Sequence, residues 1–342
     1  MWDASKCDLC GECLVRCLYV ECDKEKAAAN IQALMDEKDA EILHRCVTCC
    51  ACREYCPTGA DPFDLILRAM EEKKTFPVPP DMAKIFDLAA TVPASVSIGD
   101  SDKPALSICI MEGSLPPGAV DGEMFKGMTI VKGGDYFCYV GYIHLGQESP
   151  VEQHARQFID NLAALGKEIV FLHDDCYAMV DAKIRDYGIM VPFRYMHLYE
   201  YMRNYLRDHQ SRITPLGKKV AYQRPCASRY TPAKDAFLDE IFQLIGVERV
   251  ARRYDREEGL CCTGAFVRVY PDLAREIQAK NIDDAVASGA DALVTLCPMC
   301  DRVLRKPSAA KGLTKIYVTD LCRIALGELP YPHPVSSRAT AI

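Results

Sequence analysis

Two runs of cysteines near the N-terminus share one spacing. The first, CDLCGECLVRC, extends from Cys7 to Cys17, and the second, CVTCCACREYC, extends from Cys46 to Cys56. Three cysteines in C-x2-C-x2-C can each bind a different iron of one 4Fe-4S cubane, whereas the fourth, three residues on, points to a neighbouring cluster. The spacing therefore predicts crossed ligation, with Cys7, Cys10, Cys13 and Cys56 on cluster 1 and Cys46, Cys49, Cys52 and Cys17 on cluster 2.

Zinc explains this pattern less well, because a zinc site is closed by four ligands, typically two C-x2-C pairs. The paired runs resemble the two-cluster bacterial ferredoxins. Leu18 stands where proline often follows the fourth cysteine, and 28 residues separate Cys17 from Cys46. Because the apolar positions within residues 24–43 suit a helix, the segment is similar to the longer ferredoxin domains of respiratory iron-sulfur subunits. Cys22 and Cys50 fall outside the pattern and are interpreted as spare thiols.

A second group of cysteines follows apolar runs or turns in the C-terminal part. It comprises Cys226, the pair Cys261 and Cys262, and Cys297 with Cys300, with 34 residues in each of the two longer intervals. Strand ends can bring these five thiols to one crevice of an α/β sheet, where such folds place their ligands. Five thiolates exceed what one tetrahedral zinc uses, although a zinc site of four of them remains the alternative.

This spacing resembles the cysteine-rich CCG domain of heterodisulfide reductases and their relatives. The resemblance implies that Cys226, Cys261, Cys262, Cys297 and Cys300 hold a noncubane 4Fe-4S cluster. The family usually carries two such domains, and an earlier copy is recognisable at an offset of about 123 residues, with Cys109, Cys138 and Cys176 retained. Two of its five cysteines are missing: Tyr139 stands in place of the second cysteine of the pair, and His173 or Asp174 stands in place of Cys297.

The degenerate copy cannot form a five-thiol cluster. We expect it to be an empty structural repeat. The alternative is that Cys109, Cys138 and Cys176 hold a zinc ion or a smaller cluster, with His173 or Asp175 as the fourth ligand.

The elements around these cysteines indicate an α+β multidomain protein. From residue 105 onward, apolar runs at 105–111, 169–172, 220–223 and 292–296 alternate with helical patterns at 150–165, 232–245 and 271–288, as in α/β folds with a parallel sheet. We predict a helical two-cluster ferredoxin-like domain over residues 1–75, a proline-rich linker over 76–104, a degenerate CCG domain over 105–212, an intact CCG domain over 213–330 and a tail over 331–342. The tyrosines at 195, 199, 201 and 205 lie on a helical pattern and are expected to pack in the core or at a subunit interface.

Composition narrows the class of protein. With 342 residues, of which 49% are hydrophobic, the chain can form several globular cores. Its net charge of −7 makes nucleic acid an unlikely partner. It has no signal-peptide pattern and no apolar run long enough to span a membrane, so its 19 cysteines read as metal ligands in a reducing cytoplasm.

The resemblance as a whole implies a heterodisulfide reductase-like iron-sulfur subunit that transfers electrons between two cubanes and a noncubane cluster. No Gly-x-Gly-x-x-Gly or Walker-type loop is present, so the expected partner is a flavoprotein subunit of a bifurcating or dehydrogenase complex, or a quinone-reactive membrane subunit that would hold the chain at a membrane. A catalytic disulfide reductase acting at the noncubane cluster is the alternative. No catalytic residue is assigned.

Overall fold

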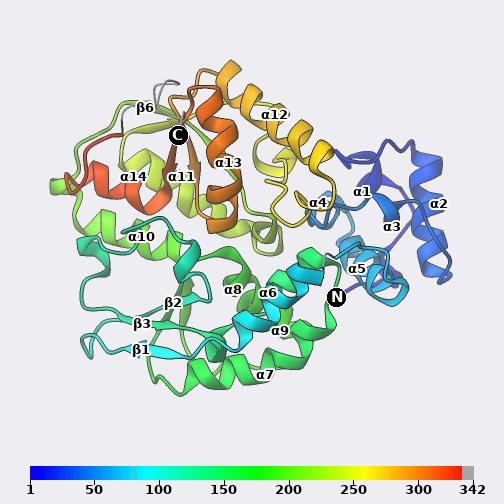
Figure 1. The fold of residues 1–342 in the computed structure, drawn as a ribbon, viewed down its shortest axis with the longest axis horizontal. Coiled ribbons are helices and arrows are strands. Elements are labelled where there is room, and N and C mark those ends of the chain that lie inside the picture. The colour runs from blue at the N-terminus through cyan, green and yellow to red at the C-terminus, as the bar shows by residue number, and fades with distance from the viewer. Residues whose placement is uncertain (79, 333–342) are drawn as a thin grey trace.

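The computed structural model describes residues 1–78 and 80–332. A helical N-terminal part lies at one end of the long axis of the molecule, and two α/β parts, each built on one sheet, make up the rest (Figure 1). The N-terminal helices are α1 (Glu12–Val15), α2 (Lys24–Met35), α3 (Ile42–Arg45), α4 (Ala51–Tyr55) and α5 (Pro62–Lys73). The single helix expected within residues 24–43 is therefore two, because the chain turns at Glu37, which has a left-handed backbone (φ 58°).

The segment expected to be a linker contributes to the fold. It contains helix α6 (Pro80–Ala90) and strand β1 (Ser95–Ser97), and β1 pairs antiparallel with β3 at the edge of the first sheet. Residue 79 of this segment and residues 333–342 of the expected tail lie outside the described residues.

The first sheet has the strand order β1-β3-β2-β4-β5. Neighbouring strands in it are parallel, except that β1 is antiparallel to β3. Its other strands are β2 (Ala105–Cys109), β3 (Thr129–Lys132), β4 (Ile169–Phe171) and β5 (Tyr195–His197). The accompanying helices are α7 (Ser149–Ala163), α8 (Asp174–Ala178), α9 (Ile184–Asp186) and α10 (Leu198–Asp208). Every residue of the central strands β2 and β4 is buried, as expected for parallel strands covered on both faces.

The second sheet repeats this plan with the order β7-β6-β8-β9, all parallel. Its strands are β6 (Lys218–Gln223), β7 (Val247–Arg249), β8 (Ala292–Thr295) and β9 (Thr314–Tyr317), and its helices are α11 (Asp235–Leu244), α12 (Pro271–Ala287), α13 (Pro298–Ala310) and α14 (Val318–Ala325). The central strands β2 and β4 of the first sheet thus correspond to β6 and β8 of the second. The predicted fold class is confirmed in its coarse form, as a mixed fold of helices and two sheets.

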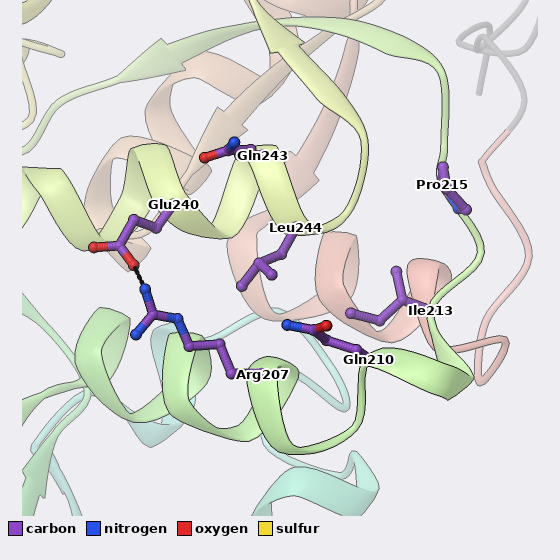
Figure 2. A pocket seen from close by; sticks show the side chains of 7 residues that line it. All are labelled: Arg207, Gln210, Ile213, Pro215, Glu240, Gln243 and Leu244. Carbon is purple, nitrogen blue, oxygen red and sulfur yellow. Dashed lines mark hydrogen bonds and ion pairs between the residues drawn. The ribbon is translucent and has the colours of Figure 1, made fainter.

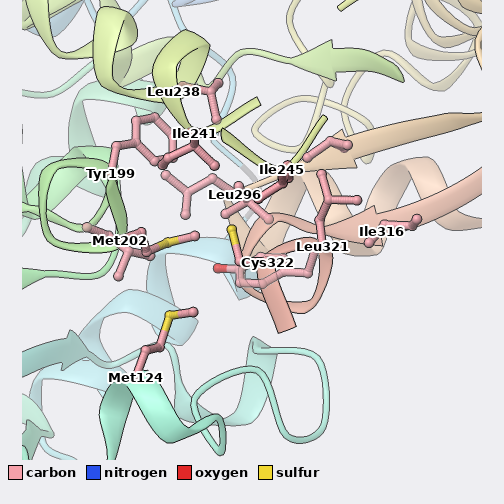
Figure 3. Close-up of a cluster of buried hydrophobic side chains, with 14 of the residues drawn as sticks. Met124, Tyr199, Met202, Leu238, Ile241, Ile245, Leu296, Ile316, Leu321 and Cys322 are labelled. Atoms are coloured by element: carbon pink, nitrogen blue, oxygen red, sulfur yellow. The ribbon is translucent and has the colours of Figure 1, made fainter. Parts of the chain in front are cut away.

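One hydrophobic core joins the two α/β parts. Met202 on α10 packs with Leu238 and Ile241 on α11, and Leu296 and Cys322 belong to the same cluster (Figure 3). Cys322 is fully buried there. This shared core fixes the two sheets relative to each other.

The tyrosine series divides between a strand and a helix. Tyr195 and His197 lie on β5, which corrects the expected helix over all four tyrosines. The helix begins only at Leu198, because the Nδ1 atom of His197 accepts a hydrogen bond from the Tyr199 amide (3.1 Å) and so caps α10. Tyr199 is fully buried and its hydroxyl bonds to that of Tyr222, which confirms the packing role predicted for it.

An open groove lies between the C-terminal ends of α10 and α11 (Figure 2). Its lining residues are Arg207, Gln210, Ile213, Pro215, Glu240, Gln243 and Leu244. An ion pair between Arg207 and Glu240 crosses one side of the groove. None of the predicted cluster ligands lines it.

Candidate metal centres

The two N-terminal cysteine runs fold into the same loop. In each run the third and fifth residues have a left-handed backbone: Leu9 (φ 57°) and Gly11 (φ 76°) in the first, Thr48 (φ 54°) and Cys50 (φ 62°) in the second. Cys50 therefore occupies the place of Gly11. Its thiol contacts the Thr48 carbonyl (3.6 Å) and lies buried in the core of the first α/β part, which accounts for a cysteine outside the ligand pattern.

The four cysteines predicted for cluster 1 line one small pocket. Cys7, Cys10 and Cys13 come from the first loop and the start of α1, and Cys56 comes from the end of α4. Burial and the neighbouring thiols, Cys56 first, raise the pKa of Cys13 to about 12. The Ala60 amide donates a hydrogen bond to the Cys56 sulfur (3.3 Å). The structure thus brings together side chains that are 49 positions apart in the sequence.

The four cysteines predicted for cluster 2 lie deeper in the molecule. Burial is the main cause that raises the pKa of each thiol, and the charges of the other members act in the same direction on Cys17, Cys46 and Cys52. Cys52 neighbours Cys17 and Cys49 of its own quartet and also Cys13 of the first quartet. The two quartets therefore lie side by side. A set of adjacent, desolvated thiols of this kind fits a polycationic iron-sulfur cluster, whose binding removes the thiol protons.

The five cysteines of the second sheet form a continuous chain of contacts. Cys226 lies at a 3-10 turn after β6 and contacts Cys261, Cys262 contacts Cys261 and Cys300, and Cys297 at the N-terminus of α13 contacts Cys300. Hydrogen bonds from Cys261 and Cys300 lower the pKa of Cys262 to about 6 despite burial. The Thr263 amide donates to the Cys261 sulfur (3.2 Å). These donors fit a cluster held by five thiolates, and the ligation itself remains a prediction.

The three cysteines retained in the first sheet also meet. The sulfur atoms of Cys109, Cys138 and Cys176 all lie within 4.8 Å of one another, and the His173 ring nitrogen Nε2 lies 3.6 Å from the Cys176 sulfur. The structure favours a shift of one residue in the expected alignment. Tyr139 (φ 59°) shares its left-handed backbone with Thr263 (φ 76°), so Phe137, not Tyr139, takes the place of the missing cysteine of the pair.

The N-terminal helical part packs against the second α/β part, where the cluster 2 cysteines lie near the five cysteines of the CCG domain. Cys49 lies close enough to Cys226 for their charges to interact, and the buried Arg229 guanidinium lies beside both. The hydroxyl of the half-buried Tyr19 accepts a hydrogen bond from the Cys261 amide (2.7 Å) and neighbours Cys49. One hydrophobic cluster, which includes Cys49 and Cys261, extends across this interface.

A buried ion-pair network holds the same interface together. The Glu54 carboxylate on α4 accepts two hydrogen bonds from the guanidinium group of Arg224 and one from Arg229, each 2.7 Å long. Sequence reasoning missed Tyr19, Glu54, Arg224 and Arg229. The position of Arg224 and Arg229 on either side of Cys226 is the one signal in the sequence that could have drawn attention to them.

Comparison with known proteins supports the resemblance. A model of the cysteine-rich domain named CCG matches residues 220–305, which include all five cysteines of the second site. The chain is 25% identical over 309 residues to a subunit of the dihydromethanophenazine:CoB–CoM heterodisulfide reductase of Methanosarcina mazei, covering 78% of this chain and 73% of that protein. The corresponding subunit of the Methanosarcina barkeri enzyme is 24% identical over 302 residues, with the same coverage.

A solved structure shares the fold. The crystal structure of a hypothetical protein from Helicobacter pylori aligns with a TM-score of 0.58 at 12% identity, over 87% of this chain and 64% of that one.

Among the described residues, no helix is long and apolar enough to cross a membrane. The chain thus contains a CCG cysteine-rich domain and is similar over most of its length to heterodisulfide reductase subunits, which confirms the resemblance predicted from the sequence.

Proposed function

We propose that this heterodisulfide reductase-like chain is an electron-transfer subunit of an oxidoreductase complex. Cys7, Cys10, Cys13 and Cys56 would hold one 4Fe-4S cubane, Cys17, Cys46, Cys49 and Cys52 a second, and the five cysteines of the CCG domain a noncubane 4Fe-4S cluster. When bound, these clusters would supply one-electron chemistry between a partner and the CCG site.

The observation that carries this proposal is the order of the three cysteine sites. The second quartet lies between the first quartet and the CCG site, because Cys52 neighbours Cys13 of the first quartet and Cys49 neighbours Cys226 of the CCG site. Tyr19 and the buried Arg229 both lie between the second quartet and the CCG site. Such an arrangement suits electron transfer from a docked partner into the interior.

A flavoprotein or a quinone-reactive membrane subunit is the partner we propose, because the chain has no flavin-binding motif of its own. The partner would dock against the half-buried first quartet. The loop that carries Cys7 and Cys10 faces solvent at Asp8, which offers an exposed contact surface there.

A catalytic disulfide reductase is the second candidate, favoured by the similarity to heterodisulfide reductase subunits. The degenerate repeat disfavours it. Cys109, Cys138 and Cys176 are three of the five thiols that a second noncubane cluster needs, so a disulfide could meet such a cluster on one side alone.

The two candidates differ in what the isolated full-length chain does. A relay reduced by an artificial low-potential donor should show reduced cubane and noncubane signals by electron paramagnetic resonance, with about twelve irons per chain. Added disulfide should leave it reduced. The reductase would instead consume donor and disulfide steadily. If Cys262→Ser abolished this turnover and Cys22→Ser retained it, the relay would be refuted and the reductase supported. Cys22 is a matched control, since it is a half-buried thiol outside the predicted ligand sets.

A further inference from the structure

A buried cation lies between the second cysteine quartet and the CCG site. Arg229 belongs to the 3-10 turn Cys226–Tyr230, and its side chain is 3% exposed. Side chains three positions apart in a 3-10 helix lie on the same face, so Arg229 leaves the turn on the side of Cys226. We propose that the Arg229 guanidinium is a shared counter-charge that raises the reduction potentials of the second cubane and the noncubane cluster, a role that rests on the function proposed above.

Hydrogen bonds hold this guanidinium in one position. One of its nitrogens donates to the Glu54 carboxylate (2.7 Å) and to the Glu257 carbonyl (2.8 Å), and the other donates to the Gly259 carbonyl (2.8 Å). The Glu257 carbonyl also accepts a hydrogen bond from the Tyr55 hydroxyl (2.8 Å) at the end of α4. The positive charge is therefore fixed between α4, which follows the second cysteine loop, and the segment just before the CCG cysteine pair.

The buried ion pairs around it leave Arg229 incompletely neutralised. Arg224 shares the Glu54 carboxylate through two hydrogen bonds, and its Nε atom also lies 2.7 Å from Asp235. Among the described residues, the other hydrogen-bond partners of Arg229 are neutral carbonyl groups. A buried charge is costly unless it is paired. The cluster thiolates on either side of Arg229 would supply the missing negative charge.

The positive charge of Arg229 acts on cysteines of both sites. Burial raises the pKa of Cys49, and the guanidinium opposes this shift. At Cys226, the contact with Cys261 and burial raise the pKa of the thiol, and Arg229 again acts in the opposite direction. A cation that favours the thiolate form also favours the more negative, reduced state of a cluster held by those thiolates. Arg229 should therefore make both clusters easier to reduce.

The first quartet serves as an internal reference. After burial, the charges that raise the pKa of Cys13 are those of Cys56, Cys10 and Cys7, all from its own quartet. The potential of the first cubane should therefore respond little to a change at Arg229. Raising the other two potentials relative to the first favours movement of electrons from the first cubane towards the CCG site.

Redox titration of the full-length protein, followed by electron paramagnetic resonance, tests this role. Two unit charges about 10 Å apart, at an effective dielectric constant of about 20, shift an equilibrium about tenfold. Arg229→Gln should therefore shift the one-electron reduction of the second cubane and of the noncubane cluster about tenfold towards the oxidised form, which lowers each midpoint potential by about 59 mV. Arg229→Lys, which keeps the charge, should restore most of both potentials. An unchanged potential at either cluster in Arg229→Gln would overturn the proposal.

A matched control separates the effect of this charge from that of losing any buried arginine. Arg252 is a guanidinium with a side chain 1% exposed, but the charges beside it are those of Asp255 and Asp284. Arg252→Gln should leave all three potentials unchanged. If it lowered the same two potentials as Arg229→Gln, the specific role of Arg229 would be refuted.

A variant of opposite sign covers the case in which Arg229→Gln fails to assemble its clusters. Glu54→Gln removes the negative charge that Arg229 shares and keeps a side chain that can hydrogen bond, so it should raise the two potentials. A lowered or unchanged potential in Glu54→Gln would refute the proposed electrostatic role. Absence of the cluster signals from the wild-type protein would instead refute the proposed function, which keeps the two failures distinct.

Discussion

The Glu54→Ala variant should loosen the contact between the N-terminal helical part and the CCG domain. Glu54 is the shared acceptor for Arg224 and Arg229, with its side chain 9% exposed and those of the arginines 4% and 3% exposed. Removing one partner of a buried ion pair costs about 3–5 kcal/mol, because the remaining charge stays buried.

The lower end of that range applies here, because both arginines keep other partners. The Arg224 Nε atom lies 2.7 Å from Asp235 Oδ2, and Arg229 donates to the carbonyls of Glu257 and Gly259 at 2.8 Å each. We therefore expect local opening of the interface to become easier by about 3 kcal/mol, which corresponds to about 100-fold faster amide exchange if exchange follows that opening.

Hydrogen exchange followed by mass spectrometry measures this change. Peptides from α4 and from the 3-10 turn Cys226–Tyr230 should exchange faster in Glu54→Ala, whereas α7, which lies outside the interface, should be unchanged. Glu72→Ala on the exposed surface of α5 is the control and should leave all three regions unaffected. Exchange of α4 within about threefold of wild type would refute the assigned role of Glu54.

Substitutions at the site residues test the remaining assignments. Cys13→Ser should lower the iron content by about four per chain and leave the noncubane signal intact, and loss of that signal would contradict separate sites. Cys262→Ser should abolish the noncubane signal and retain about eight irons, and an unchanged spectrum would contradict the five-cysteine site. Burial lowers the pKa of His197 from 6.5 to about 3, so its contribution to stability is present above pH 6.5 and is lost as the pH falls towards 3. Wild type should lose about 1 kcal/mol more unfolding free energy than His197→Asn between pH 6.5 and 5.5. Asparagine can still cap α10, so the variant keeps the helix start. If urea unfolding showed the same loss of unfolding free energy in both proteins, His197 would not be the source of the pH dependence.

Sequence reasoning worked where a regular spacing or period reports local geometry. The apolar runs predicted the central strands β2, β4, β6 and β8, because parallel strands buried on both faces read as continuous apolar segments. The proline-rich region failed for the opposite reason. Strand β1 has two exposed residues out of three, and its place is set by pairing with β3 more than 30 residues later, which no local pattern reports.

The cysteine spacing likewise predicted which thiols meet and left out what surrounds them. Tyr19 and Glu54 are separated from their partners Cys261 and Arg224 by 242 and 170 residues. A single tyrosine or glutamate carries no spacing signal, so these contacts appear only once the fold brings α4 against the turn after β6. The residues that join the predicted sites are therefore less predictable than the ligands themselves.

The two sheets show how one backbone plan can bring together two different sets of metal-ligating side chains. In each, donors come from the end of the first parallel strand, from the loop before a long helix, and from a strand–helix junction. The same three kinds of backbone position carry the donors in both sheets, so the two sites differ in the number and type of their donor side chains. Five thiols exceed the capacity of one tetrahedral ion and favour an open cluster, whereas Phe137 and His173 reduce the first set to four. The first set thus keeps three thiols and one imidazole, which leaves one complete five-thiol set for the end of the proposed relay.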